Sequence, residues 1–413
     1  MAFDGKRIRV LIVDDSAFMR KVLQSIISAD PALEVCGEAR DGKDAVAKTE
    51  LLDPDVLTMD INMPQVDGLQ ATEIIMSKQP KPIVIVSSES RDGADITLKA
   101  LELGAIDFVA KPSSGIDLDM NSVREELVRK LKMAAKVRVV RTAVRSKLGA
   151  EIASSAPRTE PAPQPLAARA TSVASPVAGS AAAAAPVMSR QPASPSSSSL
   201  VQAQAAASPA TIRGNGRFPV VVVAASTGGP QTLMNFVPRF PAGFAGAVIL
   251  VQHMPGNFTS QFSSQLAEIA QIKVKEAEHG EMLQPGVLYV CPGSHHLRVT
   301  PTGRITLDDG PRISGYRPCA DVTMETVAQF AGPMSIGVVL TGMGNDASRG
   351  VQSIKDVGGH VIAQDEATSV IFGMPAEAIK TGAVDQIAPI DNIFSVVEKR
   401  VLYVFGAARV GAL

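Results

Sequence analysis

Short apolar runs alternate with amphipathic stretches along the first part of the chain. The runs are continuous, so each predicted strand has both faces buried, as is typical of a parallel sheet. Between them, apolar residues recur every three or four positions and predict helices. The pattern predicts an α/β domain of the flavodoxin-like (βα)5 type. Its predicted strands are Ile8–Val13, Asp55–Met59, Ile83–Val86 and shorter runs near Val35 and Phe108, and its predicted helices are Ala17–Ala29, Lys43–Leu52, Gln70–Ser77, Asp95–Leu103 and one from about Ser122.

The same alternation returns after residue 217 and predicts a second, doubly wound and mainly parallel α/β domain. In such sheets the functional loops lie beyond the carboxyl ends of the strands. The predicted strands are Phe218–Ala225, Ala247–Gln252, Gly286–Cys291 and Ser335–Thr341, and the predicted helices are one near Gln231, Phe258–Gln271, Thr323–Ala331 and Ser348–Val357.

Residues 151–210, between the two patterned regions, differ in composition from both. Ala, Ser and Pro make up 40 of these 60 residues. Such a segment buries too little apolar surface to offset the entropy lost on ordering, so we predict a disordered tether. The predicted domains are therefore 6–125 and 217–405, joined by a basic helix end and a linker over 126–216.

The basic stretch at the end of the first domain has two interpretations. A solvated helix face that leads into the linker is the simpler one, and a nucleic-acid patch is the alternative. The residues concerned are Arg129, Lys130, Lys132, Lys136, Arg138, Arg141 and Arg145.

The overall composition narrows the classes of function. With 40 Lys and Arg against 41 Asp and Glu, the formal charge of −1 gives no electrostatic reason to expect nucleic acid or a membrane surface as a partner. The three cysteines, Cys36, Cys291 and Cys319, lack disulfide or metal-site spacing and suit a reducing cytoplasm. We find no signal peptide and no spanning apolar stretch, so we expect a soluble cytoplasmic protein.

Polar side chains with a common chemistry follow the predicted strands of the first domain. Asp14 and Asp15 end the first strand, Asp60 ends the third, Ser87 ends the fourth, and Lys111 follows the fifth. Carboxylates gathered at one sheet edge suit Mg2+, and a cation, an ammonium and a hydroxyl beside a carboxylate allow it to accept a phosphoryl group. The alternative is that each Asp only caps the helix that follows it.

This constellation resembles the response-regulator receiver family over about residues 6–125. The matching pieces are the Asp14–Asp15 pair, Asp60 in DINMPQVDG, Ser87 in IVIVSSE, and Lys111–Pro112 after GAIDFVA. The resemblance implies that Asp60 is the phosphoacceptor, and that Asp14, Asp15 and the backbone carbonyl of Asn62 help to hold Mg2+. It further implies that Ser87 and Phe108 form a switch pair. In that family the bond at the position of Lys111–Pro112 is often cis.

Three residues of the second domain point to nucleophilic chemistry. Ser226 lies where a strand passes into a helix in AASTGGP, His253 follows the next strand, and Asp346 follows a later one. A serine hydroxyl needs a base within hydrogen-bond reach and a group that orients the base. All three residues are predicted at the same sheet edge, as a triad requires.

Each of these residues also has a simpler explanation. The Gly-rich turn after Ser226 is equally suited to holding a phosphate. His253 alone is compatible with a structural role, and Asp346 alone with an N-cap of the helix that follows. The chain order Ser, His, Asp also differs from that of α/β-hydrolases, so a lipase-type fold is not expected.

The segments VVVVAASTGGP, VILVQHMP, YVCPGSHHL, YRPCADV and VVLTGMGNDASRG are similar to the methylesterase domain of the chemotaxis CheB family over about residues 217–405. The resemblance implies hydrolysis of glutamyl methyl esters on chemoreceptors, with release of methanol, and deamidation of receptor glutamines. Ser226 is then the nucleophile, His253 the general base and acid, and Asp346 its orienting partner. Backbone amides of Thr227 and Met343 would be the oxyanion donors, and no cofactor is expected for ester hydrolysis.

The chain departs from the family pattern at several positions. Ala347 stands where the family usually has glycine, which puts the loop geometry in doubt if that position needs a positive φ. Asn62 replaces a common acidic residue. Cys319 replaces serine and is interpreted as a small buried residue, and His295–His296 as structural or substrate-positioning residues rather than a metal pair, because neighbours on a strand point to opposite faces.

Three hypotheses follow for the whole chain. The first is a methylesterase that the receiver covers until a chemotaxis histidine kinase supplies phosphate to Asp60. The second is a non-enzymatic regulator that binds a nucleotide through ASTGGPQT, although a P-loop lysine is missing. The third is a DNA-binding response regulator, for which no basic helix-turn-helix follows the first domain.

Overall fold

The computed structural model describes residues 6–87, 91–111, 120–137 and 218–410. The expected linker and the Lys111–Pro112 bond lie outside these residues. The first domain is a five-stranded sheet in which every strand pair is parallel, in the order β2-β1-β3-β4-β5. Its strands are β1 (Ile8–Val13), β2 (Leu33–Ala39), β3 (Val56–Met59), β4 (Ile83–Ser87) and β5 (Asp107–Ala110).

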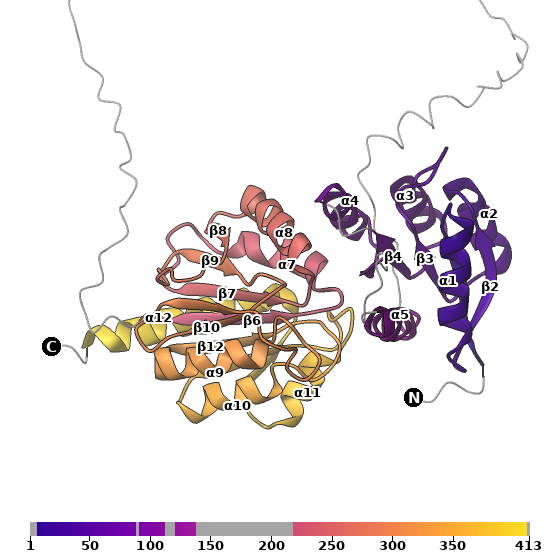
Figure 1. Ribbon diagram of the computed structural model, residues 1–413. Coiled ribbons are helices and arrows are strands. Elements are labelled where there is room, and N and C mark those ends of the chain that lie inside the picture. The colour runs from indigo at the N-terminus through magenta and orange to yellow at the C-terminus, as the bar shows by residue number, and fades with distance from the viewer. Residues whose placement is uncertain (1–5, 88–90, 112–119, 138–217, 411–413) are drawn as a thin grey trace, which may run out of the picture. The chain divides into compact units, whose positions relative to one another are not determined.

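Helices cover both faces of this sheet (Figure 1). Alternate residues of each strand face opposite sides, so Val10 and Ile12 pack with α1 and α5, while Leu11 and Val13 pack with α2, α3 and α4. Ser16, Asp41 and Asp67 accept N–H bonds at the starts of α1, α2 and α3. The helices are α1 (Ala17–Ser28), α2 (Gly42–Leu52), α3 (Gly68–Lys78), α4 (Arg91–Glu102) and α5 (Met120–Ala134).

The last helix of the first domain corrects part of the prediction. Helix α5 buries Leu127 and Leu131 in the core, so the first domain continues beyond residue 125. Lys130, expected on a solvated face, is buried and pairs with Asp107 at 3.0 Å and Glu126 at 2.8 Å. Charge periodicity alone did not reveal this pairing, because it depends on how α5 packs against β5.

The second domain is a seven-stranded sheet, again with every pair parallel, in the order β14-β13-β12-β6-β7-β9-β8. The predicted α/β class is therefore confirmed for both domains. An antiparallel hairpin of β10 and β11 was not predicted. The strands are β6 (Val220–Ala225), β7 (Ala247–Gln252), β8 (Lys273–Glu276), β9 (Val287–Val290), β10 (His296–Val299), β11 (Ile305–Asp308), β12 (Ser335–Val339), β13 (His360–Gln364) and β14 (Gln386–Ala388).

The helices of this domain form two layers (Figure 1). Val221 and Val223 of β6 pack with α7, α8 and α12, whereas Val220 and Val222 pack with α9, α10 and α11. The helices are α7 (Gly229–Phe236), α8 (Gly256–Ile269), α9 (Ala320–Ala331), α10 (Ser348–Asp356), α11 (Met374–Lys380) and α12 (Ile390–Val410), with 3-10 turns at Val237–Arg239 and Gly332–Met334.

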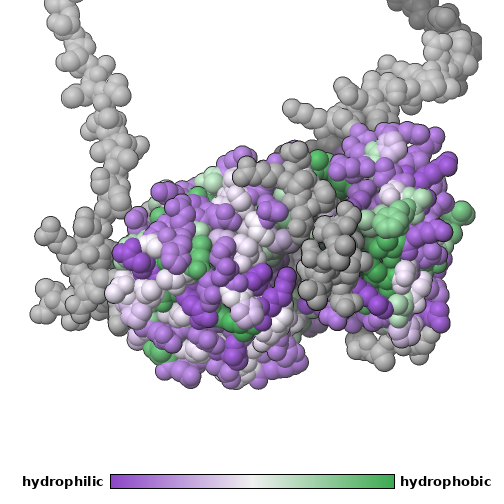
Figure 2. All heavy atoms as spheres, in the orientation of Figure 1, coloured by the Kyte–Doolittle hydropathy of each residue, from purple (hydrophilic) through white to green (hydrophobic). Residues whose placement is uncertain are grey.

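Hydrophilic residues cover most of the drawn surface of the described residues (Figure 2). Among the helices that the structure describes, none combines the length and the apolar character needed to cross a membrane.

Candidate active site

Ser226 and His253 emerge from neighbouring strands at the centre of the second sheet. Ala225 pairs with Gln252 as the last register pair of β6 and β7, and Ser226 and His253 follow immediately. The chain continues from β6 to β7 on one side and later returns to β12 on the other side of β6. This reversal is a topological switch point, the place at which parallel α/β sheets usually bind their ligands.

Close backbone packing fixes the turn that carries Ser226. The Ser226 N–H donates to the Thr341 carbonyl at 3.1 Å, and the Ser226 carbonyl accepts the Gly229 N–H at 2.8 Å. The Gln252 amide donates to the carbonyls of Ser226 at 2.9 Å and His253 at 3.2 Å, which ties the two strand ends together. A Cβ on Gly342 would lie 2.8 Å from the Ser226 Cβ, so only glycine fits beside this turn.

Asp346 orients the imidazole of His253. The two side chains meet at 2.7 Å between Nε2 and Oδ2. The other ring nitrogen, Nδ1, is buried and has no hydrogen-bond partner among the described residues. The structure thus joins His253 to Asp346 and places Ser226 at the adjacent strand end without a bond to the imidazole. Catalytic hydrogen bonds in ligand-free sites often close only around the substrate.

Asp346 is held by the first amides of α9, a helix distant in sequence. Its carboxylate, which is buried, accepts N–H bonds from Ala320 at 2.7 Å and Asp321 at 2.9 Å, and from Ala347 at 2.9 Å. The start of a helix favours an anion, because its first N–H groups are unpaired and its dipole is positive there. The alternative that Asp346 caps α10 with its side chain is wrong, because α10 has no side-chain cap.

These contacts decide the charge of Asp346. Burial alone would raise the pKa of its carboxyl, but the hydrogen bond and charge of His253 and the N–H groups of Asp321 and Ala320 lower the pKa to about 2. Cys319 also donates its thiol to Oδ1 at 3.1 Å, so it is more than a small buried residue. Burial, and then the charge of Asp346, raise the pKa of the Cys319 thiol, which keeps it a donor.

The expected oxyanion donors lie on the two loops that flank Ser226. Thr227 begins the turn into α7, and Met343 lies on the loop after β12, where the Gly342 carbonyl is fixed by the N–H of Met374 at 2.8 Å. The Thr341 hydroxyl donates to the Thr227 carbonyl at 3.1 Å, which links the two loops. These contacts fix the peptide between Gly342 and Met343 and tie the loop after β12 to the turn that follows Ser226.

Ala347 adopts the left-handed conformation, with φ of 78°. We expect Ala347→Gly to change the free energy of unfolding by less than about 1 kcal/mol in either direction, with a mean near zero. Relief of a strain of ~1–2 kcal/mol is offset by ~0.4–1 kcal/mol of chain entropy and ~0.8 kcal/mol for the lost methyl group. Urea unfolding measures this. The buried, α-helical Ala328 is the control, since Ala328→Gly should lose about 1 kcal/mol or more; equal losses in both variants would contradict the strain.

A carboxylate cluster lies at the carboxyl edge of the first sheet. Ligand atoms of Asp14, Asp15 and Asp60 lie within 4.8 Å of one another. Lys111 pairs with Asp14 and Asp60, at 2.9 Å each. The alternative that Asp60 only caps the helix that follows it is wrong, because that helix, α3, is capped by Asp67. Oxygen ligands with excess negative charge fit a divalent cation.

Burial, and then the charge of Asp14, raise the pKa of Asp60 in spite of Lys111, so a cation there would relieve unfavourable charge. Asp15 and Asn62 line one hollow of about 580 Å3 beside the cluster. A Cβ on Gly68 would lie 2.1 Å from the Asp60 carbonyl, so glycine is required behind this residue. Ser87 ends β4 and bonds the Gly93 carbonyl at 3.4 Å, and Phe108 is buried on β5.

Tyr316 was not singled out from the sequence. Its ring stacks on the His253 imidazole, with centroids 4.6 Å apart and an interplanar angle of 19°. The segment YRPCADV, which contains Tyr316, is significant in the sequence only for its similarity to the CheB family. A linear pattern does not show which ring an aromatic side chain contacts. His296 is buried and bonds the Pro311 carbonyl at 3.0 Å, in line with a structural role, and His295 bonds Ser294 at 2.8 Å.

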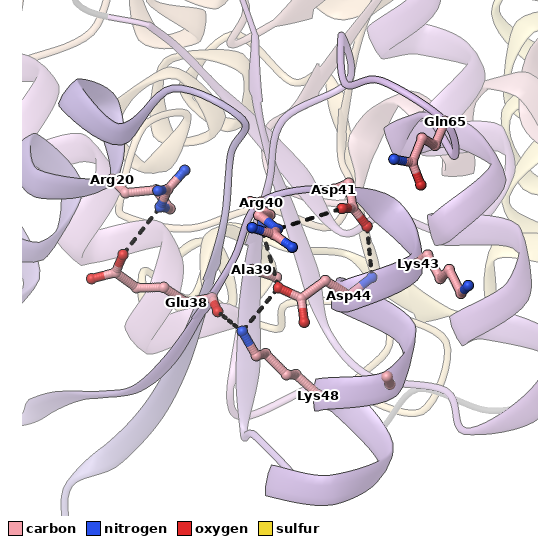
Figure 3. A pocket seen from close by; sticks show the side chains of 10 residues that line it. Arg20, Glu38, Ala39, Arg40, Asp41, Lys43, Asp44, Lys48 and Gln65 are labelled. Carbon is pink, nitrogen blue, oxygen red and sulfur yellow. Dashed lines mark hydrogen bonds and ion pairs between the residues drawn. The ribbon is translucent and has the colours of Figure 1, made fainter.

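A separate hollow of about 650 Å3 lies on the first domain, between α1, β2 and α2. Figure 3 shows the side chains that line it. Its charges are largely matched internally: Arg20 pairs with Glu38 at 3.1 Å, and Lys48 pairs with Asp44 at 2.9 Å. It contains none of the expected catalytic or metal-binding residues, so the site chemistry lies elsewhere.

A second acidic cluster has the composition of a metal site, but its carboxylate oxygens already accept hydrogen bonds from the protein. Ligand atoms of Cys319, Asp321 and Asp346 lie within 4.8 Å of one another. The Asp346 oxygens accept the N–H bonds given above, and the Asp321 carboxylate accepts the Gly350 N–H at 2.8 Å. A cation would have to displace these donors, so the cluster is structural.

A receiver-type sheet with clustered carboxylates, followed by a parallel α/β domain with Ser, His and Asp at its switch point, defines a response regulator with an enzymatic output domain. Family models agree: the response regulator receiver domain matches residues 10–121, and CheB methylesterase matches residues 221–397. The chain belongs to the protein-glutamate methylesterase/protein-glutamine glutaminase family.

The similarity to individual members extends over the whole chain. The protein-glutamate methylesterase/protein-glutamine glutaminase of Pyrococcus abyssi is 41% identical over 100% of this chain and 98% of its own length, and that of Pyrococcus horikoshii is 42% identical with the same coverage. A crystal structure of the Thermotoga maritima CheB methylesterase catalytic domain is 38% identical, covers 45% of this chain and 98% of that chain, and has a TM-score of 0.43.

Proposed function

We propose that this protein hydrolyses γ-methyl esters of glutamate on chemoreceptors and deamidates receptor glutamines, and that phosphorylation of Asp60 activates it. The observation that carries the proposal is the His253–Asp346 hydrogen bond of 2.7 Å beside Ser226, at the switch point of the sheet. A base held in one orientation next to a strand-end serine is the arrangement that acyl transfer requires.

The reaction proceeds in two halves. His253 accepts the hydroxyl proton of Ser226 at Nδ1 as the serine oxygen attacks the ester carbonyl, and Asp346 stabilises the imidazolium. The amides of Thr227 and Met343 bind the oxyanion, and His253 then protonates the leaving methoxide, which departs as methanol. Water attacks the acyl-serine by the same route and leaves a glutamate carboxylate and free Ser226. With a glutamine substrate the leaving group is ammonia.

The receiver domain regulates the esterase activity through phosphorylation. Asp14, Asp15, Asp60 and the Asn62 carbonyl would hold Mg2+, which supplies charge neutralisation for phosphoryl transfer to the Asp60 carboxylate. Lys111 would form an ion pair with the phosphoryl oxygens on Asp60. Ser87 and Phe108 would change conformation when the phosphoryl group is present. We propose a chemotaxis histidine kinase as the phosphodonor and chemoreceptors as the substrate.

The function is tested by incubating the full chain with chemoreceptor-containing membranes that carry labelled methyl esters. Methanol should be released, and receptors with glutamine at the same positions should release ammonia. The nucleotide-binding alternative predicts neither product but saturable binding of ATP or NAD, and the DNA-binding alternative predicts a salt-dependent shift of DNA. Failure to release methanol under phosphorylating conditions would refute the proposal.

Asp60→Asn should remove the response to phosphorylation. In the unaltered protein, a small acyl phosphate with Mg2+ should raise methanol release by roughly 5- to 150-fold, the usual range of coupling between two sites. Asp60→Asn should keep its basal rate of methanol release, and the acyl phosphate should not raise that rate. Without Mg2+, the acyl phosphate should not raise the rate of the unaltered protein either. Asp53→Asn, at an exposed carboxylate of the same domain, is the control and should respond normally. A normal response in Asp60→Asn would exclude it as the phosphoacceptor.

A further inference from the structure

We propose that Tyr316 is a positioning residue that fixes the plane of the His253 imidazole and couples it to the loop carrying Met343. This inference rests on the proposed role of His253 as the base. The two rings are nearly parallel, at 19°, and their centroids lie 4.6 Å apart. Asp346 fixes one atom of the imidazole, Nε2, and a single hydrogen bond leaves rotation about that contact open. A ring stacked on one face closes this freedom.

Tyr316 also contacts the oxyanion loop with its other end. Burial raises the pKa of Tyr316 in spite of the nearby Asn345 N–H, so the phenol stays neutral. A Cβ added to Gly344 would lie 1.9 Å from this oxygen, which shows how closely the hydroxyl rests on the loop. Gly344 has φ of 95°, so glycine is needed there for its conformation as well. One side chain therefore touches both the base and the loop next to Met343.

The backbone of Tyr316 is itself anchored. It exchanges two hydrogen bonds with Ile313, at 3.0 and 2.9 Å, across a two-residue turn at Ser314 and Gly315. Both turn residues have positive φ, 52° and 86°, as a tight hairpin turn requires. On the other side, the chain enters α9, whose first amides hold Asp346. The same segment thus orients the two members of the pair, His253 through a ring and Asp346 through a helix start.

A stacked aromatic ring has a specific consequence for catalysis. The imidazole becomes a cation when it takes the serine proton, and an aromatic face favours a cation more than a neutral ring. The contact therefore becomes stronger as the reaction proceeds, and an interaction of that kind raises kcat rather than lowering KM.

The test compares Tyr316→Leu with Tyr316→Phe in the full, phosphorylated chain, with methanol release from labelled receptor membranes as the readout. Tyr316→Leu should lower kcat by about tenfold with little change in KM, because an aromatic pair is lost. Tyr316→Phe keeps the stacked ring but loses the hydroxyl contact with the loop, so its kcat should lie between those of Tyr316→Leu and the unaltered protein. Tyr403→Leu, at an exposed tyrosine of α12, is the control and should have no effect.

Three results would overturn the inference: an unchanged kcat in Tyr316→Leu, a change in KM alone, or equal losses in Tyr316→Phe and Tyr316→Leu. Should Tyr316→Leu not fold, Tyr316→Met, which keeps a long apolar side chain without a ring, takes its place. His253→Gln separates this inference from the proposed function. If His253→Gln retains activity, the role of the base is wrong; if it is inactive while Tyr316→Leu is fully active, only the role of Tyr316 is wrong.

Discussion

Replacing Ser226 with alanine is expected to lower ester hydrolysis by roughly 10^4- to 10^6-fold, as removal of the nucleophile does in other serine hydrolases. The alanine side chain fits the same turn, because the Ser226 backbone is held by Thr341, Gly229 and Gln252 rather than by its own hydroxyl. The loss should therefore appear in kcat, with receptor binding and the free energy of unfolding unchanged. Methanol release from labelled receptors measures the rate, and urea unfolding measures the stability.

Ser264→Ala is the matched control for this variant. Ser264 is an exposed serine on α8 whose hydroxyl bonds the Ser260 carbonyl of the same helix, so its loss should leave the rate within a factor of two or so of the unaltered protein. Methylesterase activity that persisted in Ser226→Ala would rule out a serine nucleophile at this position. Ammonia release should fall in parallel with methanol release, since the proposed mechanism uses the same hydroxyl for both reactions.

The strands that bear the site were predictable because they are buried on both faces. The run Phe218–Ala225 and the run Ala247–Gln252 contain little besides apolar residues, and the structure places β6 and β7 within them. Residues at the ends of such strands necessarily share one edge, so the approach of Ser226 and His253 followed from the sequence. The hairpin of β10 and β11 was missed because its four-residue strands are partly polar and form no apolar run.

Contacts that depend on tertiary packing were harder to predict from the sequence. The environment of Asp346 comes from α9, whose first turn was predicted to begin later, at Thr323, so its free amides were not expected near Asp346. Nothing in the local pattern distinguishes an aspartate that caps its own helix from one bound by another. The same holds for Tyr316, since stacking depends on a turn at Ser314 that contributes no hydrophobic periodicity.

Asp346→Asn is expected to reduce kcat by roughly 10^4-fold, because an amide cannot fix the imidazole as a carboxylate does or stabilise its charged form. The structure adds a second effect. The carboxylate accepts N–H bonds from Ala320, Asp321 and Ala347, and an asparagine NH2 group would face at least one of these donors. Leaving a buried donor unpaired should lower the free energy of unfolding by roughly 1–3 kcal/mol. Activity and stability therefore decline together at Asp346, whereas Ser226→Ala loses activity alone.

The pH dependence of this stability difference separates a charge effect from a packing effect. The folded pKa of Asp346 is about 2, below its ordinary value of about 3.9. A depressed folded pKa stabilises the protein above the unfolded pKa, and this contribution is lost as the pH falls toward the folded pKa. The gap between the unaltered protein and Asp346→Asn should therefore be full near pH 7 and should narrow as the pH falls from about 5 toward 2. Asp356→Asn, at an exposed carboxylate on α10, should show no such gap in urea unfolding. A gap for Asp346→Asn that stayed constant over this range would mean that side-chain shape, rather than the negative charge at the start of α9, holds this part of the site together.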